Sequence, residues 1–287
     1  MLTIEQTDFY KENGYLTVEE VITKGQLNKL QEITYEFIER SRQVTENDDI
    51  FDLDEGHSAE SPRLTRIKLP HKNNKYFDEI LKRSGVTEVL RDLLGDNATL
   101  LTSKLNTKAP GGGMAVEWHQ DWAFYPHTND DLITVGIYLD DCFEKNGPLK
   151  IIKSSHKKKL YNHQNKENFF IGKIDLKKNK IGINKSVSIT GTAGTVVFFH
   201  CRSVHGSGHN HMDSSRPLIL FGYRACDAWP LINDGNPHPE VDLENYDKNI
   251  IVGKKSIKPR LTKVPTIIPL PKKKHYVSIY ELQKNKY

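Results

Sequence analysis

The pattern of apolar residues changes its period near residue 98, and this change constrains the fold more than any other feature of the chain. Beyond that point, short runs of β-branched and aromatic residues alternate with Gly, Asn and Pro turns, which is typical of β-strands. The expected strands are 99–107, 132–139, 149–153, 186–189, 195–200 and 217–223. Helices followed by a block of strands predict an α+β fold built around a β-sandwich or jelly roll.

The part of the chain before residue 98 is predicted to be mainly helical, because apolar residues recur there at spacings of three and four. The expected helices are 9–13 after an N-cap at Thr7-Asp8 and before Gly14, 26–38, and 75–94 before Gly95. Between the last two helices, the segment 46–60 contains seven acids, and we expect it to form a solvated loop. Nothing in the sequence forces a second domain, so 1–287 is predicted to be one domain.

The net charge of +4 conceals an uneven distribution along the chain. Residues 251–287 hold ten Lys and Arg and one acid, a net charge of +9, which leaves −5 for residues 1–250. A basic tail can bind nucleic acid, but no platform of aromatic side chains is interleaved with these charges. We therefore expect residues 226–287 to form a basic, Pro-containing extension, 98–225 to form the β-rich core, and nucleic acid not to be a partner.

The composition is that of an ordinary folded protein, with 27% charged and 37% hydrophobic residues. The apolar stretches are too short to span a bilayer. The N-terminus carries acids and lacks the apolar region of a secretion signal. Three cysteines without paired spacing argue against a disulfide framework and favour a reducing compartment, so we expect a cytoplasmic location. No feature of the sequence sets the oligomeric state.

The segment 117–122 (EWHQDW) carries the most informative polar pattern. In a strand, side chains two residues apart share a face, so His119 and Asp121 would converge. A third metal ligand would come from a distant strand, and His205, after an apolar run, is the leading candidate. Two His and one Asp leave coordination positions open, which suits Fe(II), whereas closed zinc sites favour Cys-rich sets. By itself the pattern is weak, because the chain has 12 His.

Arg216 strengthens this interpretation. It opens the apolar strand predicted at 217–223, and an arginine that enters an interior strand is costly unless it is paired. A dicarboxylate in the interior would provide that partner through a two-pronged hydrogen bond.

Together these segments resemble the phytanoyl-CoA dioxygenase family of Fe(II)/2-oxoglutarate oxygenases, most densely between residues 101 and 224. The resemblance is carried by 108–110 (KAP), 118–121 (WHQD), the strand 134–139, 140–149 (DDCFEKNGPL), 154–157 (SSHK), 194–200 (GTVVFFH), His205 and Arg216. It implies a cupin-like double-stranded β-helix (jelly-roll) core with N-terminal helices packed on one sheet.

The resemblance also implies roles for individual residues. His119, Asp121 and His205 would be the catalytic iron ligands. Arg216 would pair with the distal carboxylate of 2-oxoglutarate, with Ser207 beside it. Lys104 and Arg66 match positions of further co-substrate contacts. The implied cofactor is Fe(II), with 2-oxoglutarate and O2 as co-substrates. Halogenating relatives lack the carboxylate at the position of Asp121, so halogenation is not expected.

Five further residues are candidate substrate contacts because of their position near the motif or their charge. These are Trp122, Phe124, His127, Arg202 and Arg224. For each, the alternative is a structural role in the core or in a salt bridge. His200, His209 and His211 are expected to be structural or loop residues rather than ligands.

We therefore expect a dioxygenase that oxidises an unactivated C–H bond of a small metabolite, with release of succinate and CO2. The substrate is expected to carry a carboxylate and to be derived from an amino acid in a secondary metabolite biosynthetic pathway. The outcome could be hydroxylation, desaturation or radical ring closure. Two alternatives stay open: an acyl-CoA 2-hydroxylase of the phytanoyl-CoA type, and a non-catalytic β-helix binding protein.

Overall fold

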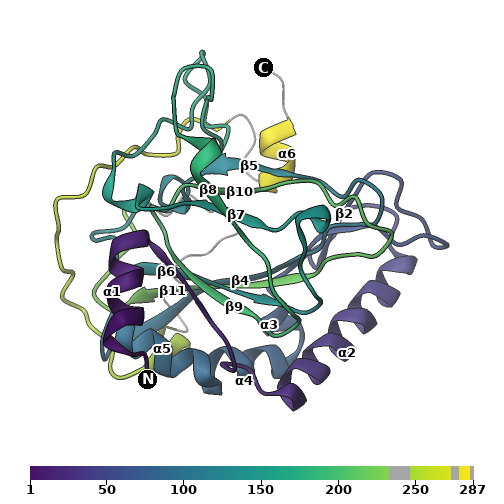
Figure 1. Cartoon of the computed structure of the whole chain (residues 1–287), viewed down its shortest axis with the longest axis horizontal. Helices are drawn as coiled ribbons and strands as arrows, with labels where there is room; N and C mark the ends of the chain where they lie inside the picture. The colour runs from purple at the N-terminus through teal and green to yellow at the C-terminus, as the bar shows by residue number, and fades with distance from the viewer. Residues whose placement is uncertain (233–245, 273–277, 285–287) are drawn as a thin grey trace.

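The computed structural model, which describes residues 1–232, 246–272 and 278–284, contains two antiparallel β-sheets that enclose an interior between them (Figure 1). Across the larger sheet the strands are β1 (Tyr15–Val18), β9 (Val196–His200), β6 (Leu132–Tyr138), β11 (Leu218–Ala225), β4 (Ala98–Asn106), β3 (Leu64–Lys68) and β2 (Phe51–Leu53), with β12 (Ile250–Val252) also paired to β4. The smaller sheet has the order β5 (Val116–His119), β10 (His205–Ser207), β7 (Leu149–Ile152) and β8 (Ser186–Ile189). This is the predicted α+β jelly roll.

Strand alternation distributes the side chains of the larger sheet between two cores. On β9, Val196 and Phe198 belong to the core under the helices, whereas Val197 and Phe199 belong to the core between the sheets. A strand buried on both faces reads as a continuous apolar run, which is why this segment was recognisable from the sequence.

The N-terminal helices cover the outer face of the larger sheet, as predicted (Figure 1). These helices are α1 (Ile4–Asn13), α2 (Lys24–Arg40), α3 (Pro70–Asn73), α4 (Lys75–Arg83) and α5 (Gly85–Leu94). A further helix, α6 (Ile279–Lys284), lies near the other end of the chain. The apolar sides of α2, α4 and α5 pack on the sheet through residues such as Phe37, Phe77 and Leu90, all at most 2% exposed.

Two helix boundaries differ from the prediction. The cap of α1 is Thr3, because its hydroxyl and the Gln6 side chain form a reciprocal capping box, whereas the Thr7 hydroxyl bonds back to the Thr3 carbonyl from inside the helix. The segment 75–94 is two helices rather than one. Ser84 is extended between them and its side chain accepts from the backbone of Val86, which starts α5.

Several short strands were not predicted. The N-terminal part is mainly helical but also contributes β1, β2 and β3 to the larger sheet. The acidic segment 46–60 is therefore not wholly a solvated loop: it contains β2, and Asp52 is buried there in ion pairs with Arg66 and Lys68. Edge strands of three to five residues carry little periodic signal, because pairing with a neighbour rather than local sequence holds them.

Across the described parts of the chain, no helix combines the length and the apolar character needed to cross a bilayer.

Candidate active site

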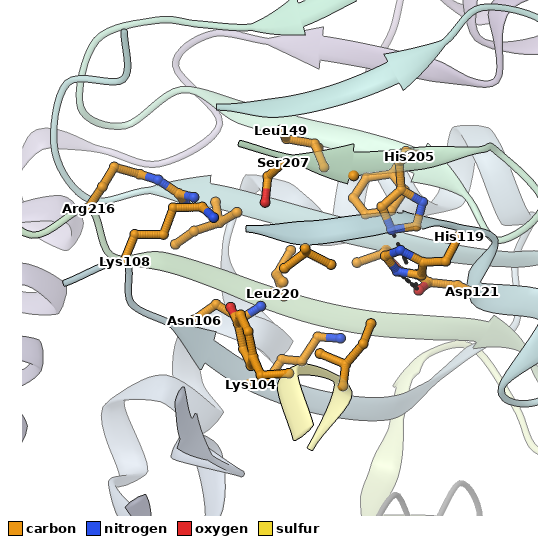
Figure 2. Close-up of a pocket in the computed structure, with 17 residues that line it drawn as sticks. Lys104, Asn106, Lys108, His119, Asp121, Leu149, His205, Ser207, Arg216 and Leu220 are labelled. Carbon is orange, nitrogen blue, oxygen red and sulfur yellow. Dashed lines mark hydrogen bonds and ion pairs between the residues drawn. The ribbon is translucent and has the colours of Figure 1, made fainter. Parts of the chain in front are cut away.

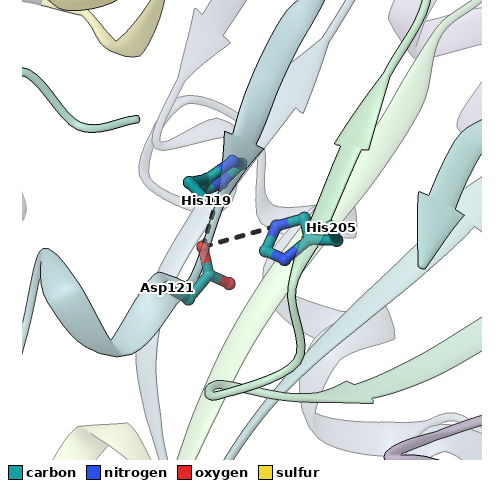
Figure 3. A group of neighbouring side chains, drawn as sticks. All are labelled: His119, Asp121 and His205. Atoms are coloured by element: carbon teal, nitrogen blue, oxygen red, sulfur yellow. Dashed lines mark ion pairs between the residues drawn. The ribbon is translucent and has the colours of Figure 1, made fainter. Parts of the chain in front are cut away.

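Three buried side chains converge inside the jelly roll, and each presents one atom that could bind a metal ion. The candidate ligand atoms of His119, Asp121 and His205 all lie within 4.8 Å of one another. The Oδ1 atom of Asp121 lies 3.6 Å from Nε2 of His119 and 3.7 Å from Nε2 of His205 (Figure 3). Each side chain belongs to a residue that is at most 5% exposed.

Strand pairing brings these residues together. His119 ends β5 and lies directly opposite His205, which begins β10. Asp121 was expected on the same strand as His119, but it is the first residue of a 3-10 turn, Asp121–Ala123. The intervening Gln120 is still extended, with φ −121° and ψ 127°, so the carboxylate turns to the same side as the imidazole.

Hydrogen bonds fix the orientation of each candidate ligand. Nδ1 of His119 bonds the carbonyl of Glu117 at 2.8 Å, and Nδ1 of His205 bonds that of Ser203 at 2.9 Å. Since a carbonyl only accepts, each Nδ1 carries the proton and each Nε2 keeps a lone pair for a metal. The Thr134 hydroxyl donates to Oδ2 of Asp121 at 2.8 Å, which leaves Oδ1 facing the imidazoles.

The protonation states also suit a metal ion. Burial lowers the pKa of His205 to about 3, so its imidazole is neutral. Burial alone would raise the pKa of Asp121, but His205, His119 and Lys104 hold it below its usual value, so the carboxylate is ionised. Two imidazoles and one carboxylate on one side of a site, with no thiolate, form the donor set that fits a non-haem Fe(II) with open positions.

The metal-binding group forms one end of a pocket of about 550 Å³ (Figure 2). The pocket lies between the sheets and is lined by Lys104, Asn106, Lys108, Val116, His119, Asp121, Thr134, Leu149, Phe199, His205, Gly206, Ser207, Arg216, Leu218, Leu220, Ile279 and Tyr280.

Arg216 lies at the other end of the pocket and is 2% exposed (Figure 2). Its Nη2 donates to the carbonyl of Gly147 at 3.0 Å, and its guanidinium lies 5.6 Å from the centre of the Tyr138 ring. Its Nε and Nη1 have no hydrogen-bond partner within the part of the chain that the structure describes. Buried donors are normally paired, so a ligand with acceptor oxygens fits this end of the pocket.

Two of the other predicted co-substrate contacts, Lys104 and Ser207, line the pocket. Lys104 makes no hydrogen bond or ion pair with any residue that the structure describes, and burial lowers the pKa of its ammonium group. Ser207 is placed on β10 between Leu149 and Val116, and its hydroxyl points into the pocket (Figure 2).

Three predicted arginines are not in the pocket lining. Arg66 is in a buried ion pair with Asp52, with Nη2 and the carboxylate 2.6 Å apart. Arg202 pairs with Asp130 at 3.0 Å. Arg224 donates to the carbonyl of Ala228 and lies over the ring of Trp229. Each of the three thus has partners within the protein, which for Arg202 and Arg224 favours the alternative of a structural role.

The aromatic candidates are also outside the pocket lining. Trp122 is fully buried, and its Nε1 donates to the carbonyl of Pro265 at 3.0 Å. The ring of Phe124 packs edge-on against His119, with ring centres 5.6 Å apart, so it contacts a candidate ligand without lining the pocket. His127 is 2% exposed and bonds the carbonyl of Tyr125 through Nδ1.

The sequence analysis missed several residues of the pocket. Two of them, Asn106 and Lys108, follow the predicted Lys104 at intervals of two along β4 and its continuation, so alternation could have identified all three as one face. Lys108 donates to the carbonyls of Met114 and Gly208. Ile279 and Tyr280 carried no such signal, because they belong to α6, far away in the sequence.

Comparison with known proteins connects this geometry to a family. Residues 10–218 match the family described as Phytanoyl-CoA dioxygenase (PhyH). The chain is 33% identical over 283 residues to a "Probable alpha-ketoglutarate-dependent hypophosphite dioxygenase" of Stutzerimonas stutzeri, covering 98% of this chain and 96% of that protein.

Solved structures share the fold. The crystal structure of EctD from S. alaskensis with bound Fe has a TM-score of 0.65 at 22% identity, covering 78% of this chain and 77% of EctD. EctD with 2-oxoglutarate and 5-hydroxyectoine has a TM-score of 0.62 at 23% identity, with the same coverage. Because the family match spans most of the jelly roll and the curated relative spans nearly the whole chain, this protein belongs to the phytanoyl-CoA dioxygenase (PhyH) family and is an Fe(II)- and 2-oxoglutarate-dependent dioxygenase.

Proposed function

We propose that this dioxygenase oxidises a small anionic molecule in the pocket between the two sheets. The observation that carries the proposal is the charge of the pocket wall: Lys108 and Arg216 are buried there, Lys104 is half-buried, and Asp121 is the only acid among the described residues that line the pocket. Buried cations without acidic partners are costly, and anionic ligands relieve that cost. Two of the three cations have pKa values lowered by burial, which is the sign of this uncompensated charge.

In this proposal the chain holds the reactants rather than carrying out the oxidation itself. His119, Asp121 and His205 bind the iron. Arg216 and Ser207 bind the distal carboxylate of 2-oxoglutarate, and Lys108 adds positive charge at that end. Bound Fe(II) and 2-oxoglutarate supply the chemistry by activating O2, with release of succinate and CO2. The apolar side chains of Leu149, Phe199 and Leu220 exclude water around the reacting bond.

Lys104 would then attract the anionic group of the substrate. It lies at the metal end of the pocket, where Asp121 is its strongest opposite charge. A carboxylate-bearing, amino-acid-derived metabolite would satisfy this cation. Hydroxylation, desaturation and ring closure are all compatible with a C–H bond held beside the iron.

A phosphorus oxyanion is a second candidate substrate. The observation in its favour is the identity of 33% to the hypophosphite dioxygenase over nearly the whole chain. Hypophosphite is also a small anion, so the same three cations would favour it. A CoA thioester fits less well, because the pocket between the sheets must hold 2-oxoglutarate as well and would leave the nucleotide outside.

The test is the release of succinate from 2-oxoglutarate by the iron-loaded enzyme across a panel of compounds. The panel contains hypophosphite, free amino acids including L-proline, ectoine and an acyl-CoA, each followed by mass spectrometry of the product. We expect stimulation by a small anion together with an oxidised product. Stimulation by the acyl-CoA alone would overturn the proposal.

A further inference from the structure

The short helix α6, near the end of the chain, forms part of the pocket wall. Its residues Ile279 and Tyr280 line the same pocket as the metal-binding group, although about 160 positions separate them from His119 in the sequence. Figure 1 places α6 beside β5, the strand that ends at His119. The C-terminal extension is thus more than a solvated tail, since part of it completes the site.

Specific contacts hold α6 in place. The side chain of Gln283 accepts a hydrogen bond from the backbone of Glu117 on β5 at 2.9 Å and donates to the carbonyl of Gly172 at 2.7 Å. The ammonium group of Lys173 donates to the carbonyl of Gln283 at 2.6 Å. On the apolar side, Leu282 packs into the cluster that contains Trp122 and Phe170.

The approach at Gly172 is close enough to require glycine. Its φ is +62°, and a Cβ built there would lie 2.8 Å from Leu282 and 2.7 Å from Phe124. Helix α6 therefore packs closely against this surface, and the packing holds Tyr280 in a defined position.

Tyr280 is a buried residue, 3% exposed, whose hydroxyl forms no hydrogen bond with the residues that the structure describes. Two other fully buried tyrosines differ: Tyr138 donates to the carbonyl of Ile189 and Tyr223 to that of Leu81. Tyr10 also lacks a partner, but it lies in the core under the helices and not in the pocket.

Tyr280 lines the same pocket as Arg216. Burial raises the pKa of its phenol to about 12, the guanidinium groups of Arg216 and Arg66 oppose that rise, and the carboxylates of Asp54 and Asp52 add to it. The phenol is therefore neutral at physiological pH and keeps its proton to donate. Among the residues that the structure describes, Nε and Nη1 of Arg216 also find no hydrogen-bond partner.

We propose that Tyr280 is a co-substrate-binding residue: its hydroxyl donates a hydrogen bond to the distal carboxylate of 2-oxoglutarate, which Arg216 binds from the opposite side. A carboxylate accepts several hydrogen bonds, so one anion satisfies the unpaired donors of both residues. Helix α6 then closes the pocket over the co-substrate. This inference rests on the proposed role of Arg216 and extends it to the C-terminal part of the chain.

The test is an anaerobic titration of the Fe(II)-loaded protein with 2-oxoglutarate, followed by the visible metal-to-ligand charge-transfer band. We expect Tyr280→Phe to weaken 2-oxoglutarate binding on the order of tenfold or more, because a hydrogen bond to a charged acceptor is lost. Tyr246→Phe is the matched control. That phenol donates to the carbonyl of Cys226 outside the pocket, so its loss leaves the titration unchanged.

A second titration uses pyruvate, a 2-oxo acid without the distal carboxylate. Tyr280→Phe should bind pyruvate as the wild type does. Equal affinity of wild type and Tyr280→Phe for 2-oxoglutarate would overturn the inference, and so would an equal loss for both acids. A wild-type protein that gives no band with 2-oxoglutarate would instead refute the site assignment itself.

Discussion

The two ends of the pocket are built in opposite ways. At the metal end, Nδ1 of each candidate histidine ligand is fixed by a backbone carbonyl two residues earlier, and Thr134 fixes the carboxylate of Asp121. Away from the metal end, Nε and Nη1 of Arg216 have no partner among the described residues, and no described residue bonds the phenol of Tyr280. The first end is oriented before any ligand arrives, whereas the second is satisfied only by a ligand.

A hydrogen bond from Nδ1 of a histidine to a nearby backbone carbonyl does not by itself identify a metal ligand. His127 and His163 make the same bond, from Nδ1 to the carbonyl two residues earlier, at 2.8 Å each. Neither side chain is among the residues that line the pocket, and Nε2 of His163 instead accepts a hydrogen bond from the backbone N–H of Gln120 at 3.0 Å. What distinguishes the candidate ligands is the convergence of two strands on one acid.

The largest expected effect comes from the metal end. Asp121→Ala should abolish tight iron binding and reduce 2-oxoglutarate turnover by roughly three orders of magnitude or more, because the only acid among the pocket-lining residues is lost. Iron content and succinate release measure this. The matched control is His211→Ala on an exposed loop, which should keep both. An Asp121→Ala variant that retains iron and turnover would refute the metal site.

At the other end, Arg216→Gln should leave iron binding intact and weaken 2-oxoglutarate binding by roughly 100-fold, since a buried charge-assisted contact is removed. The charge-transfer titration measures the dissociation constant. Arg202→Gln removes an arginine that pairs with Asp130 outside the pocket lining and should not change it. If Arg202→Gln and Arg216→Gln behave alike, the contrast between the two ends of the pocket is wrong.

Lys104→Met tests whether the cation at the metal end of the pocket serves the substrate. Its side chain keeps the length of lysine without the charge, so we expect the KM for the anionic substrate to rise by about tenfold, with a smaller change for 2-oxoglutarate. Lys150→Met, on the other face of β7 from the pocket, is the control. An equal loss of affinity for 2-oxoglutarate would place Lys104 in the co-substrate site instead.

The smallest effect concerns a structural histidine. Burial lowers the pKa of His127 to about 3, so below pH 6.5 the unfolded chain takes up a proton that the folded protein does not. The free energy of unfolding therefore falls as pH decreases, by at most about 1.4 kcal/mol per pH unit for this group. Denaturant unfolding of wild type and His127→Leu at about pH 7 and about pH 5 checks this. The variant should lose less stability, and equal losses would exclude His127 as a cause.

Particular residues show how far the sequence could be interpreted. The continuous apolar run that includes Val197 and Phe199 predicted β9, and the run from Leu132 predicted β6. Both runs are apolar because these strands are buried on both faces. The break at Ser84 was not predictable, because it depends on Gly85 packing against Val21, where a Cβ would lie 2.6 Å from the Val21 carbonyl oxygen. Arg66 was assigned to the co-substrate, but the buried strand β2 supplies Asp52 as its partner.

The sequence by itself determined the class of fold, the His-x-Asp pattern at 119–121 and the arginine that needs an anion, since these follow from side-chain chemistry and from spacing along one strand. Only the tertiary structure decided which of the 12 histidines meets Asp121, which arginines are already paired, and that α6 completes the pocket. The physical reason is that strand pairing and helix docking join segments far apart in the chain, and such long-range contacts leave no local period.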